Sequence, residues 1–234
     1  MRIYFILVRP ELPENIGAAA RAMKTMGFRF LRLVSPCDHR DKRARWTAHG
    51  SADILSKTRV YNNLGNAIHD MDFVIGTTSK HRTRKADYHP SNEILDLVRA
   101  KGDTAARTGI VFGPERTGLD NMELSLCDIV ATVPMAQQYP SLNLAQAVML
   151  FAYELSPLAV TPRRHKRGHR DQAQFRALKR DVAALLETLG ISSDSSRHQR
   201  IMERMAALGG DDVKLVYGAV SRMGQRATRS AEGG

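Results

Sequence analysis

The chain has 234 residues, enough to bury a sizeable core as one domain or as one domain with a small appendage. Its hydrophobic fraction of 43% is ordinary for a globular protein, but its formal net charge of +11 and pI near 10.0 are not. A charge of this size predicts a polyanionic partner, RNA or DNA before an anionic membrane. Residues 1–160 carry 20 Lys and Arg against 16 Asp and Glu, and the remainder carries 15 against 8, so the excess lies towards the C-terminus.

The cysteine content and the apolar runs indicate where the protein works. Cys37 and Cys127 are the two cysteines, and no CxxC pair is present, which excludes a disulfide framework and suits a reducing compartment. The N-terminal sequence MRIYFILVRPELPENIG predicts no signal peptide, because its apolar run is short and acidic residues follow soon after it. No apolar run approaches the roughly 20 residues of a membrane span. We therefore expect a cytoplasmic protein with no membrane partner.

The first elements predict a parallel sheet. Residues 3–8 form a near-continuous apolar run of the kind that parallel sheets bury on both faces. A helix is expected over 16–26, with a surface made unusually small by Gly17 and four alanines. Such a helix can lie close against a sheet or another backbone. Gly27 is expected to end it, and a second strand is expected over 28–34.

The middle of the chain continues the alternation of strands and helices. The polar and basic segment 38–57 predicts two short helices, and a short strand at 58–61 and a helix near 64–69 follow. Another buried strand is predicted at 73–75, and it opens into a polar turn that starts at Gly76. An amphipathic helix is predicted over 91–99. We therefore expect the first 155 or so residues to form an α/β domain with a parallel sheet.

Residues 109–151 contain the first candidate site. They predict a strand at 109–112, a helix at 121–127 capped by Asp120 and Glu123, and a second strand at 129–133. Asn143 then caps a long helix whose apolar face is Leu144, Val148, Phe151 and Leu155. Ligands of open α/β sheets bind at the carboxyl ends of the strands, so the turns 113–118 and 133–143 are expected to form the site.

The character of the sequence changes after Pro157. Residues 161–170 are a basic linker, and residues 171–234 form a helical extension that we expect to bind RNA. Three helical patterns follow the linker, and the tail from residue 225 is expected to be disordered. The first pattern has an apolar face of Phe175, Leu178, Val182, Leu185 and Leu189, and the second and third are expected to be capped by Asp194 and Asp211.

Several familiar chemistries are absent from the sequence. The turn GPERTG at 113–118 is superficially like a phosphate loop but lacks its Lys-Ser/Thr pair, which excludes a nucleotide triphosphatase. No GxGxxG follows the first strand, and no HExxH or GxSxG occurs anywhere. The histidines are scattered, and we expect them to face solvent or RNA rather than to bind a metal. The polar turns at the strand ends 76–80, 113–118 and 133–143 remain as the candidates.

Three motifs in order resemble a known family. They are NIGAAARAMKTMG at 15–27, FGPERTGL at 112–119, and Val133-Pro134 followed by SLNLA at 141–145. They are similar to the motifs of the SpoU/TrmH branch of the SPOUT superfamily of RNA methyltransferases. Within that branch the likeness is greatest to the TrmJ family of tRNA anticodon-loop 2′-O-methyltransferases. The likeness covers about the first 155 residues, and the basic helical extension is similar in kind.

The resemblance implies a fold and an assembly that the sequence pattern does not. It implies a parallel-sheet α/β SPOUT domain over 1–160 whose C-terminal part is threaded into a deep trefoil knot, followed by the small helical extension. It also implies a homodimer. General topology rules argue against knots, so the knot rests on the resemblance alone.

The resemblance also implies a cofactor and site residues. The methyl donor is S-adenosylmethionine, with no metal, and the cofactor pocket is expected to be lined by Thr78, Ser79, Lys80, Gly113, Val133, Pro140, Ser141 and Leu142. Arg21 matches the catalytic arginine of the family, Ser141 and Asn143 match groups that place the reacting ribose, and Asn15 belongs to the same catalytic set. Arg21 stays protonated, so it suits a phosphate clamp better than a general base. Glu115 is open between a structural partner of the small-residue helix and a substrate contact.

The predicted function is that of an S-adenosylmethionine-dependent tRNA (cytidine/uridine-2′-O-)-methyltransferase acting at anticodon-loop nucleoside 32. A 2′-O-methyltransferase of rRNA or of another tRNA position stays open, as does a knotted RNA-binding protein without catalysis. The basic segments 42–45, 82–85 and 161–170 and the extension are predicted to contact RNA phosphates.

Overall fold

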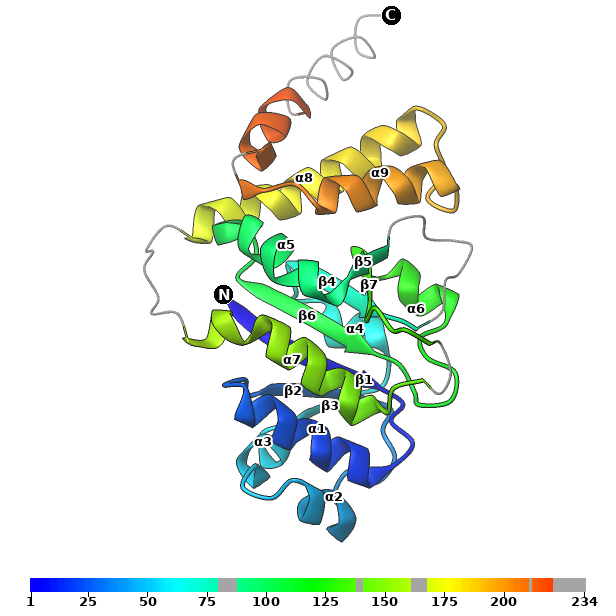
Figure 1. The fold of residues 1–234 in the computed structure, drawn as a ribbon. Coiled ribbons are helices and arrows are strands. Elements are labelled where there is room, and N and C mark those ends of the chain that lie inside the picture. Colours follow the sequence, from blue (N-terminus) through cyan, green and yellow to red (C-terminus); the bar gives the residue numbers. More distant parts are fainter. Residues whose placement is uncertain (80–87, 138–140, 161–167, 211, 221–234) are drawn as a thin grey trace, which may run out of the picture.

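The computed structural model describes residues 1–79, 88–137, 141–160, 168–210 and 212–220. In this part of the chain all strands join one seven-stranded sheet of order β3-β2-β1-β6-β4-β7-β5, and every neighbouring pair is parallel (Figure 1). The strands are β1 (Arg2–Val8), β2 (Phe30–Val34), β3 (Arg59–Tyr61), β4 (Phe73–Thr77), β5 (Tyr88–Pro90), β6 (Arg107–Phe112) and β7 (Ile129–Thr132). The predicted parallel α/β fold is confirmed, with β5 as an edge strand that the sequence did not reveal.

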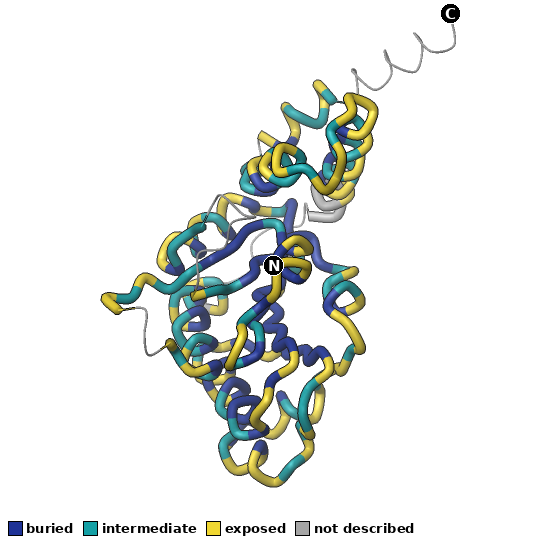
Figure 2. Tube along the Cα trace, turned by 90° about the vertical axis from the view of Figure 1, so that its right-hand side faces the viewer, coloured by how far each residue is buried: buried dark blue, intermediate teal, exposed yellow. Residues whose placement is uncertain are grey.

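Helices cover both faces of this sheet. The helices of the sheet domain are α1 (Pro13–Thr25), α2 (Lys42–Thr47), α3 (Ala52–Ser56), α4 (Leu64–Ile68), α5 (Ile94–Ala100), α6 (Asn121–Ser125) and α7 (Leu144–Val160), with the short 3-10 turns η1 (Ser91–Glu93) and η2 (Gly102–Thr104). Alternate residues of β1 separate the two faces: Ile3, Phe5 and Leu7 pack with α1, α5 and α7, whereas Tyr4, Ile6 and Val8 pack with the shorter α4 and α6. The dark band of buried residues in Figure 2 follows this sheet.

The small-residue helix makes the close approach that its composition predicted. A Cβ added at Gly17 would lie 2.0 Å from the carbonyl oxygen of Ala44, so α1 and α2 pack backbone to backbone at this point. The helix begins at Pro13, one turn earlier than expected, because proline suits the first turn of a helix. Asn15 therefore lies within the first turn of the helix.

The extension packs against the amino end of the sheet domain. Its helices α8 (Gly168–Thr188) and α9 (Ser196–Ala206) lie side by side above the sheet, and residues 212–220 are helical as well (Figure 1). The guanidinium of Arg176 pairs with Asp72 at 3.0 Å, and Lys179 pairs with Asp128. Lys101 donates from its ammonium group to the carbonyl oxygen of Leu208 at 3.0 Å.

Two details of the extension differ from the sequence prediction. Leu186 rather than Leu185 joins the buried face of α8, and Leu189, which follows the last residue of the helix, is 65% exposed. Ser195 rather than Asp194 caps α9, since its hydroxyl accepts the hydrogen bond from the N–H of His198. Asp211, most of the linker and the tail lie outside the described residues.

Within the described residues, no helix is both long and apolar enough to cross a bilayer. The trefoil knot and the boundaries at residues 160 and 170 stay predictions.

Candidate active site

A cleft of about 470 Å³ opens at the carboxyl ends of β4, β6 and β7. Its wall is completed by the first turns of α7, so the two turns expected to form the site do meet there. The lining residues come from four segments: Thr77, Thr78 and Ser79; Phe112 to Gly118; Val133 and Met135; and Ser141, Leu142, Leu144, Ala147 and Phe151. The cleft therefore has an apolar base, provided by Phe112, Leu144 and Phe151, and a polar rim.

The turn after β6 has a shape that depends on glycine. Gly118 has φ +67°, a left-handed conformation that favours glycine, and its N–H donates to the carbonyl oxygen of Pro114 at 2.9 Å. A Cβ added at Gly113 would lie 2.2 Å from the amide nitrogen of Leu119. The turn therefore folds back onto its own start, and Gly113 and Gly118 present backbone to the cleft without a Cβ.

The amino end of α7 is fixed by a reciprocal cap. The side-chain oxygen of Asn143 accepts from the N–H of Ala145 at 2.8 Å, and the N–H of Asn143 donates to the side chain of Gln146 at 3.0 Å. Asn143 is thus held where its other side-chain atom, Nδ2, can reach across the cleft edge.

A chain of hydrogen bonds joins the three sequence motifs at the rim of the cleft. Asn143 Nδ2 donates to Asn15 Oδ1 at 2.9 Å, and Asn15 Nδ2 donates to Glu115 Oε1 at 2.7 Å. The second oxygen of Glu115 accepts from the N–H of Glu11 at 2.9 Å. Asn15 is 100 positions from Glu115 and 128 positions from Asn143 in the sequence, so these hydrogen bonds bring distant segments together. Asn15 itself is 7% exposed. Glu115 is a structural partner of α1 in this arrangement.

The SpoU rRNA Methylase family matches residues 2–153, which include all three motifs and the whole cleft. The chain belongs to the SpoU methylase family. The predicted membership and the predicted class of enzyme, an RNA methyltransferase, are thereby confirmed. A second match covers residues 172–217, which are similar to the C-terminal domain of the tRNA/rRNA methyltransferase LasT.

Individual relatives support both matches. The chain is 41% identical to the uncharacterized tRNA/rRNA methyltransferase LasT of Escherichia coli, over 93% of this chain and 95% of that protein. It is 37% identical to the tRNA (cytidine/uridine-2′-O-)-methyltransferase TrmJ of Sodalis glossinidius, over 65% of this chain and 60% of that protein. The crystal structure of TrmJ from Z. mobilis superposes with a TM-score of 0.67 and 29% identity, over 95% of this chain and 99% of that one.

Within this SpoU domain, the predicted site residues fall into four groups. Lining the cleft are Thr78, Ser79, Gly113, Val133, Ser141 and Leu142. Asn15 and Asn143 belong to the hydrogen-bonded chain at the rim, while Lys80 and Pro140 lie outside the described residues. Arg21 is exposed on α1 and does not line the cleft within this one chain.

Sequence reasoning missed the ion pair that fixes the carboxyl end of β1. Arg9 has a left-handed backbone, φ 46°, and its guanidinium holds both carboxylate oxygens of Glu123. The hydrogen bond to Glu123 raises the pKa of Arg9, so this cation stays charged. No local pattern signals the pair, because its members are 114 positions apart.

The described residues contain no group of three or more His, Cys, Asp and Glu side chains placed to hold a metal ion. Burial is the main factor that raises the pKa of the Cys37 thiol, and the nearby Glu115 carboxylate adds to it. Cys37 is therefore a thiol rather than a reactive thiolate at neutral pH.

Proposed function

We propose that this SpoU methylase transfers a methyl group from S-adenosylmethionine to the 2′-hydroxyl of cytidine or uridine at position 32 of the tRNA anticodon loop. The observation that carries the proposal is the hydrogen-bonded chain from Glu115 through Asn15 to Asn143, which ties the three family motifs to one cleft. The name of the Sodalis relative supports the reaction on tRNA. We further propose that the protein works as a cytoplasmic homodimer.

The cleft fits the proposed cofactor. Leu142, Leu144 and Phe151 offer an apolar wall suited to the flat face of an adenine. The backbone of the turn that starts at Gly113 and the hydroxyls of Thr78 and Ser79 offer polar groups for a ribose and an amino acid moiety. Bound S-adenosylmethionine supplies a methyl group on a sulfonium, an activated leaving group that needs no metal.

The residues of the chain then have two tasks, which are to position the ribose and to assist the loss of the proton from its 2′-hydroxyl. Asn143, held by its cap and by Asn15, and Ser141 at the cleft mouth are placed to orient the 2′-oxygen. The side-chain amide of Asn143 is already fixed by these hydrogen bonds, so it loses little conformational freedom when it binds the ribose. The network therefore contributes to the rate of methyl transfer by positioning the 2′-oxygen. Proton loss goes to the adjoining phosphate or to water.

Arg21 is proposed to clamp that phosphate and to stabilise negative charge that develops on the 2′-oxygen. Because Arg21 is exposed on α1 and away from the lining of its own cleft, this role favours a dimer in which it faces the partner's site. The homodimer and the catalytic role of Arg21 are therefore linked parts of one proposal.

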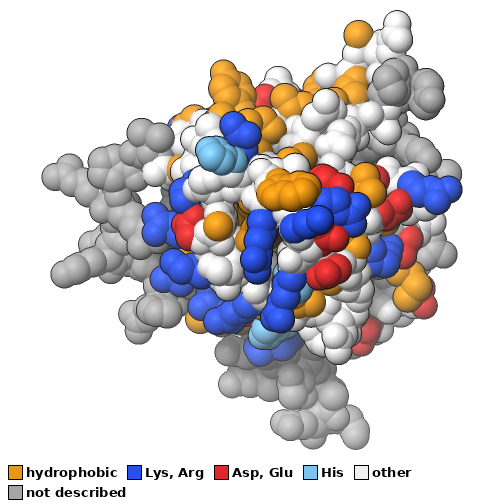
Figure 3. Space-filling view, turned by 90° about the horizontal axis from the view of Figure 1, so that it is seen from below, with side chains coloured by type: hydrophobic (Ala, Val, Ile, Leu, Met, Phe, Trp, Pro, Cys, Tyr) orange, Lys and Arg blue, Asp and Glu red, His pale blue; other side chains and the backbone are white. Residues whose placement is uncertain are grey.

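RNA binding is proposed to involve the basic face over α2 and α3. Figure 3 shows this face from below, with Lys and Arg side chains gathered on it. Trp46 is 68% exposed there and has the ammonium of Lys42 5.4 Å from its ring centroid, an arrangement suited to stacking on an unpaired base. Arg43 is committed to Asp41 and Glu14 instead, at 3.0 and 3.3 Å.

Methylation of tRNA by the purified protein tests the proposal. The protein is incubated with S-adenosylmethionine and unmodified tRNA, and nucleosides at each position are mapped by mass spectrometry. We expect 2′-O-methylcytidine or 2′-O-methyluridine at position 32. Methylation at another tRNA position or of rRNA only would contradict the proposed target, and cofactor uptake without methylation of any RNA would favour a non-catalytic binder.

The variant Arg21→Ala separates catalysis from binding. We expect calorimetry to show unchanged affinity for S-adenosylmethionine, since Arg21 does not line the cleft, while methylation is lost. Arg21→Lys keeps the positive charge but cannot bind a phosphate in the bidentate geometry of a guanidinium, so it should recover only part of the methylation rate. Turnover at the wild-type level in Arg21→Ala would refute the assigned role.

A further inference from the structure

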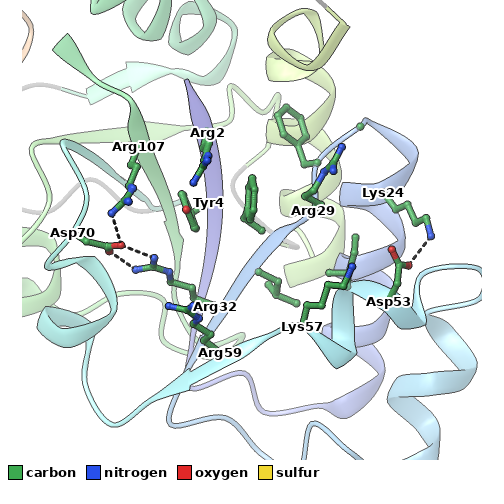
Figure 4. Close-up of a pocket in the computed structure, with 15 residues that line it drawn as sticks. Arg2, Tyr4, Lys24, Arg29, Arg32, Asp53, Lys57, Arg59, Asp70 and Arg107 are labelled. Carbon is green, nitrogen blue, oxygen red and sulfur yellow. Dashed lines mark hydrogen bonds and ion pairs between the residues drawn. The ribbon is translucent and has the colours of Figure 1, made fainter. Parts of the chain in front are cut away.

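A second pocket, of about 580 Å³, lies at the amino ends of β1, β2, β3 and β6, the sheet edge opposite the cofactor cleft (Figure 4). Seven of its lining residues are cations and two are carboxylates: Arg2, Lys24, Arg29, Arg32, Lys57, Arg59 and Arg107 against Asp53 and Asp70. Neither the cofactor nor the methyl transfer uses any of them. So many like charges around one cavity repel each other, which an anionic ligand would relieve.

One wall of the pocket is a rigid ionic and aromatic frame. Arg32 is only 4% exposed, and it donates to both oxygens of Asp70 at 2.6 and 2.9 Å and to the carbonyl oxygen of Ala67 at 2.6 Å. Arg107 donates to the same carboxylate at 3.0 Å. The guanidinium of Arg32 also covers the Tyr4 ring at 4.5 Å. These contacts commit Arg32 and Arg107 to Asp70, which pairs with no other cation among the described residues.

Other cations of the pocket are uncommitted. The side chains of Arg29 and Arg59 make no hydrogen bond or ion pair with any described residue, and both are exposed beside the pocket. Lys24 is different, because its ammonium binds Asp53 at 2.6 Å. Figure 4 shows Arg29 and Lys57 on the side of the pocket away from the Asp70 network, whereas Arg59 lies beside Arg32, its partner on the neighbouring strand.

We propose that this pocket binds backbone phosphates of the RNA substrate, at a point away from the nucleotide that is methylated. The inference rests on the proposed function for the identity of the RNA. Exposed guanidinium groups around an open basic pocket match phosphodiesters, which accept two parallel N–H bonds. β1 separates the two edges by about 20 Å at 3.3 Å per residue, so phosphates bound at this pocket lie well away from a ribose at the cofactor cleft.

The salt dependence of tRNA binding tests the pocket directly. Dissociation constants are measured by fluorescence anisotropy between 50 and 300 mM salt for wild type, Arg29→Gln, Arg59→Gln and the double variant. Each lost phosphate contact should make the log–log slope shallower by about 0.9 and weaken binding about eightfold at 0.1 M salt. Asp53→Asn removes a carboxylate from the same pocket and should strengthen binding.

Arg99→Gln is the matched control, because it loses one charge on α5, outside the pocket. Arg29→Gln and Arg59→Gln should weaken tRNA binding more than this control while affinity for S-adenosylmethionine stays at the wild-type value. Equal effects from Arg59→Gln and Arg99→Gln would overturn the pocket, as would tight binding of tripolyphosphate without any change for tRNA. Binding is read without turnover, so loss of the pocket and failure of the methylation assay are separate results.

Discussion

Lys101 carries a buried ammonium group where the helical extension meets the sheet domain, and its replacement by methionine gives a sharp prediction. The residue is 1% exposed, donates to Leu208, and lies 4.7 Å from the ring centroids of both Phe73 and Phe175. Desolvation lowers the pKa of Lys101 from 10.5 to about 7, and the Asp128 carboxylate offsets only part of this.

The energetic cost of burying this charge follows from the pKa of Lys101 in the unfolded chain, 10.5, and in the folded protein, about 7. These two values are separated by about 3.5 pH units, and each unit corresponds to about 1.4 kcal/mol, so burying the charged form costs up to about 5 kcal/mol. Below pH 7 the Lys101 ammonium is charged in both the folded and the unfolded protein, so folding bears the whole cost of burying the charge. Between pH 7 and 10.5 the unfolded chain binds more protons than the folded one, so the free energy of unfolding rises with pH.

Urea denaturation of wild type and Lys101→Met at pH 6, 7, 8 and 9 measures this cost. The difference between the two proteins cancels the titration of groups that they share. We expect wild type to gain about 2–3 kcal/mol relative to the variant between pH 7 and 9, because only wild type is relieved of the buried charge. A difference that is independent of pH would refute the reasoning, and so would one that falls as the pH rises.

Three further substitutions test the turn at the cleft, the contact between α1 and α2, and the cap of α6. Gly113→Ala places a Cβ 2.2 Å from the nitrogen of Leu119, and calorimetry should show loss of S-adenosylmethionine binding from a protein that still folds by circular dichroism. Gly17→Ala pushes α1 away from Ala44 and should lower the free energy of unfolding in urea by about 1–3 kcal/mol, whereas Gly218→Ala, at a helical glycine with open space around it, should cost less. Asp120→Ala removes the cap of α6 and should cost about 0.5–2 kcal/mol in the same assay, with Asp120→Asn restoring most of it.

The sheet domain was predictable because its signals are local. Apolar runs bounded by Gly and Pro mark β1, β4, β6 and β7, and the turns that follow β4, β6 and β7 line the cleft as expected. The capping box at Asp120 and the apolar face of α7 also follow from spacing alone. β5 escaped notice because Tyr88–Pro90 is short and half buried, so its sequence shows no apolar run.

The missed features depend on contacts between distant residues. A lysine predicts an exposed side chain, yet Lys101 is buried because α8 and the segment after α9 cover it. The chain from Glu115 to Asn143 needs three segments in register, which single-sequence patterns do not encode. Arg21 shows a related limit, since the resemblance implies its chemistry but not where one chain places it.

The central claim is that the cleft between the turns after β4, β6 and β7 holds the methyl donor beside a fixed Asn143. A crystal structure of the protein with S-adenosylhomocysteine tests this most directly. We expect the adenine against Leu142 and Phe151, the ribose near Gly113, and the sulfur facing the side of the cleft where Asn143 and Ser141 lie. Ligand bound elsewhere, or a cleft closed by its own side chains at saturating ligand, would contradict the account.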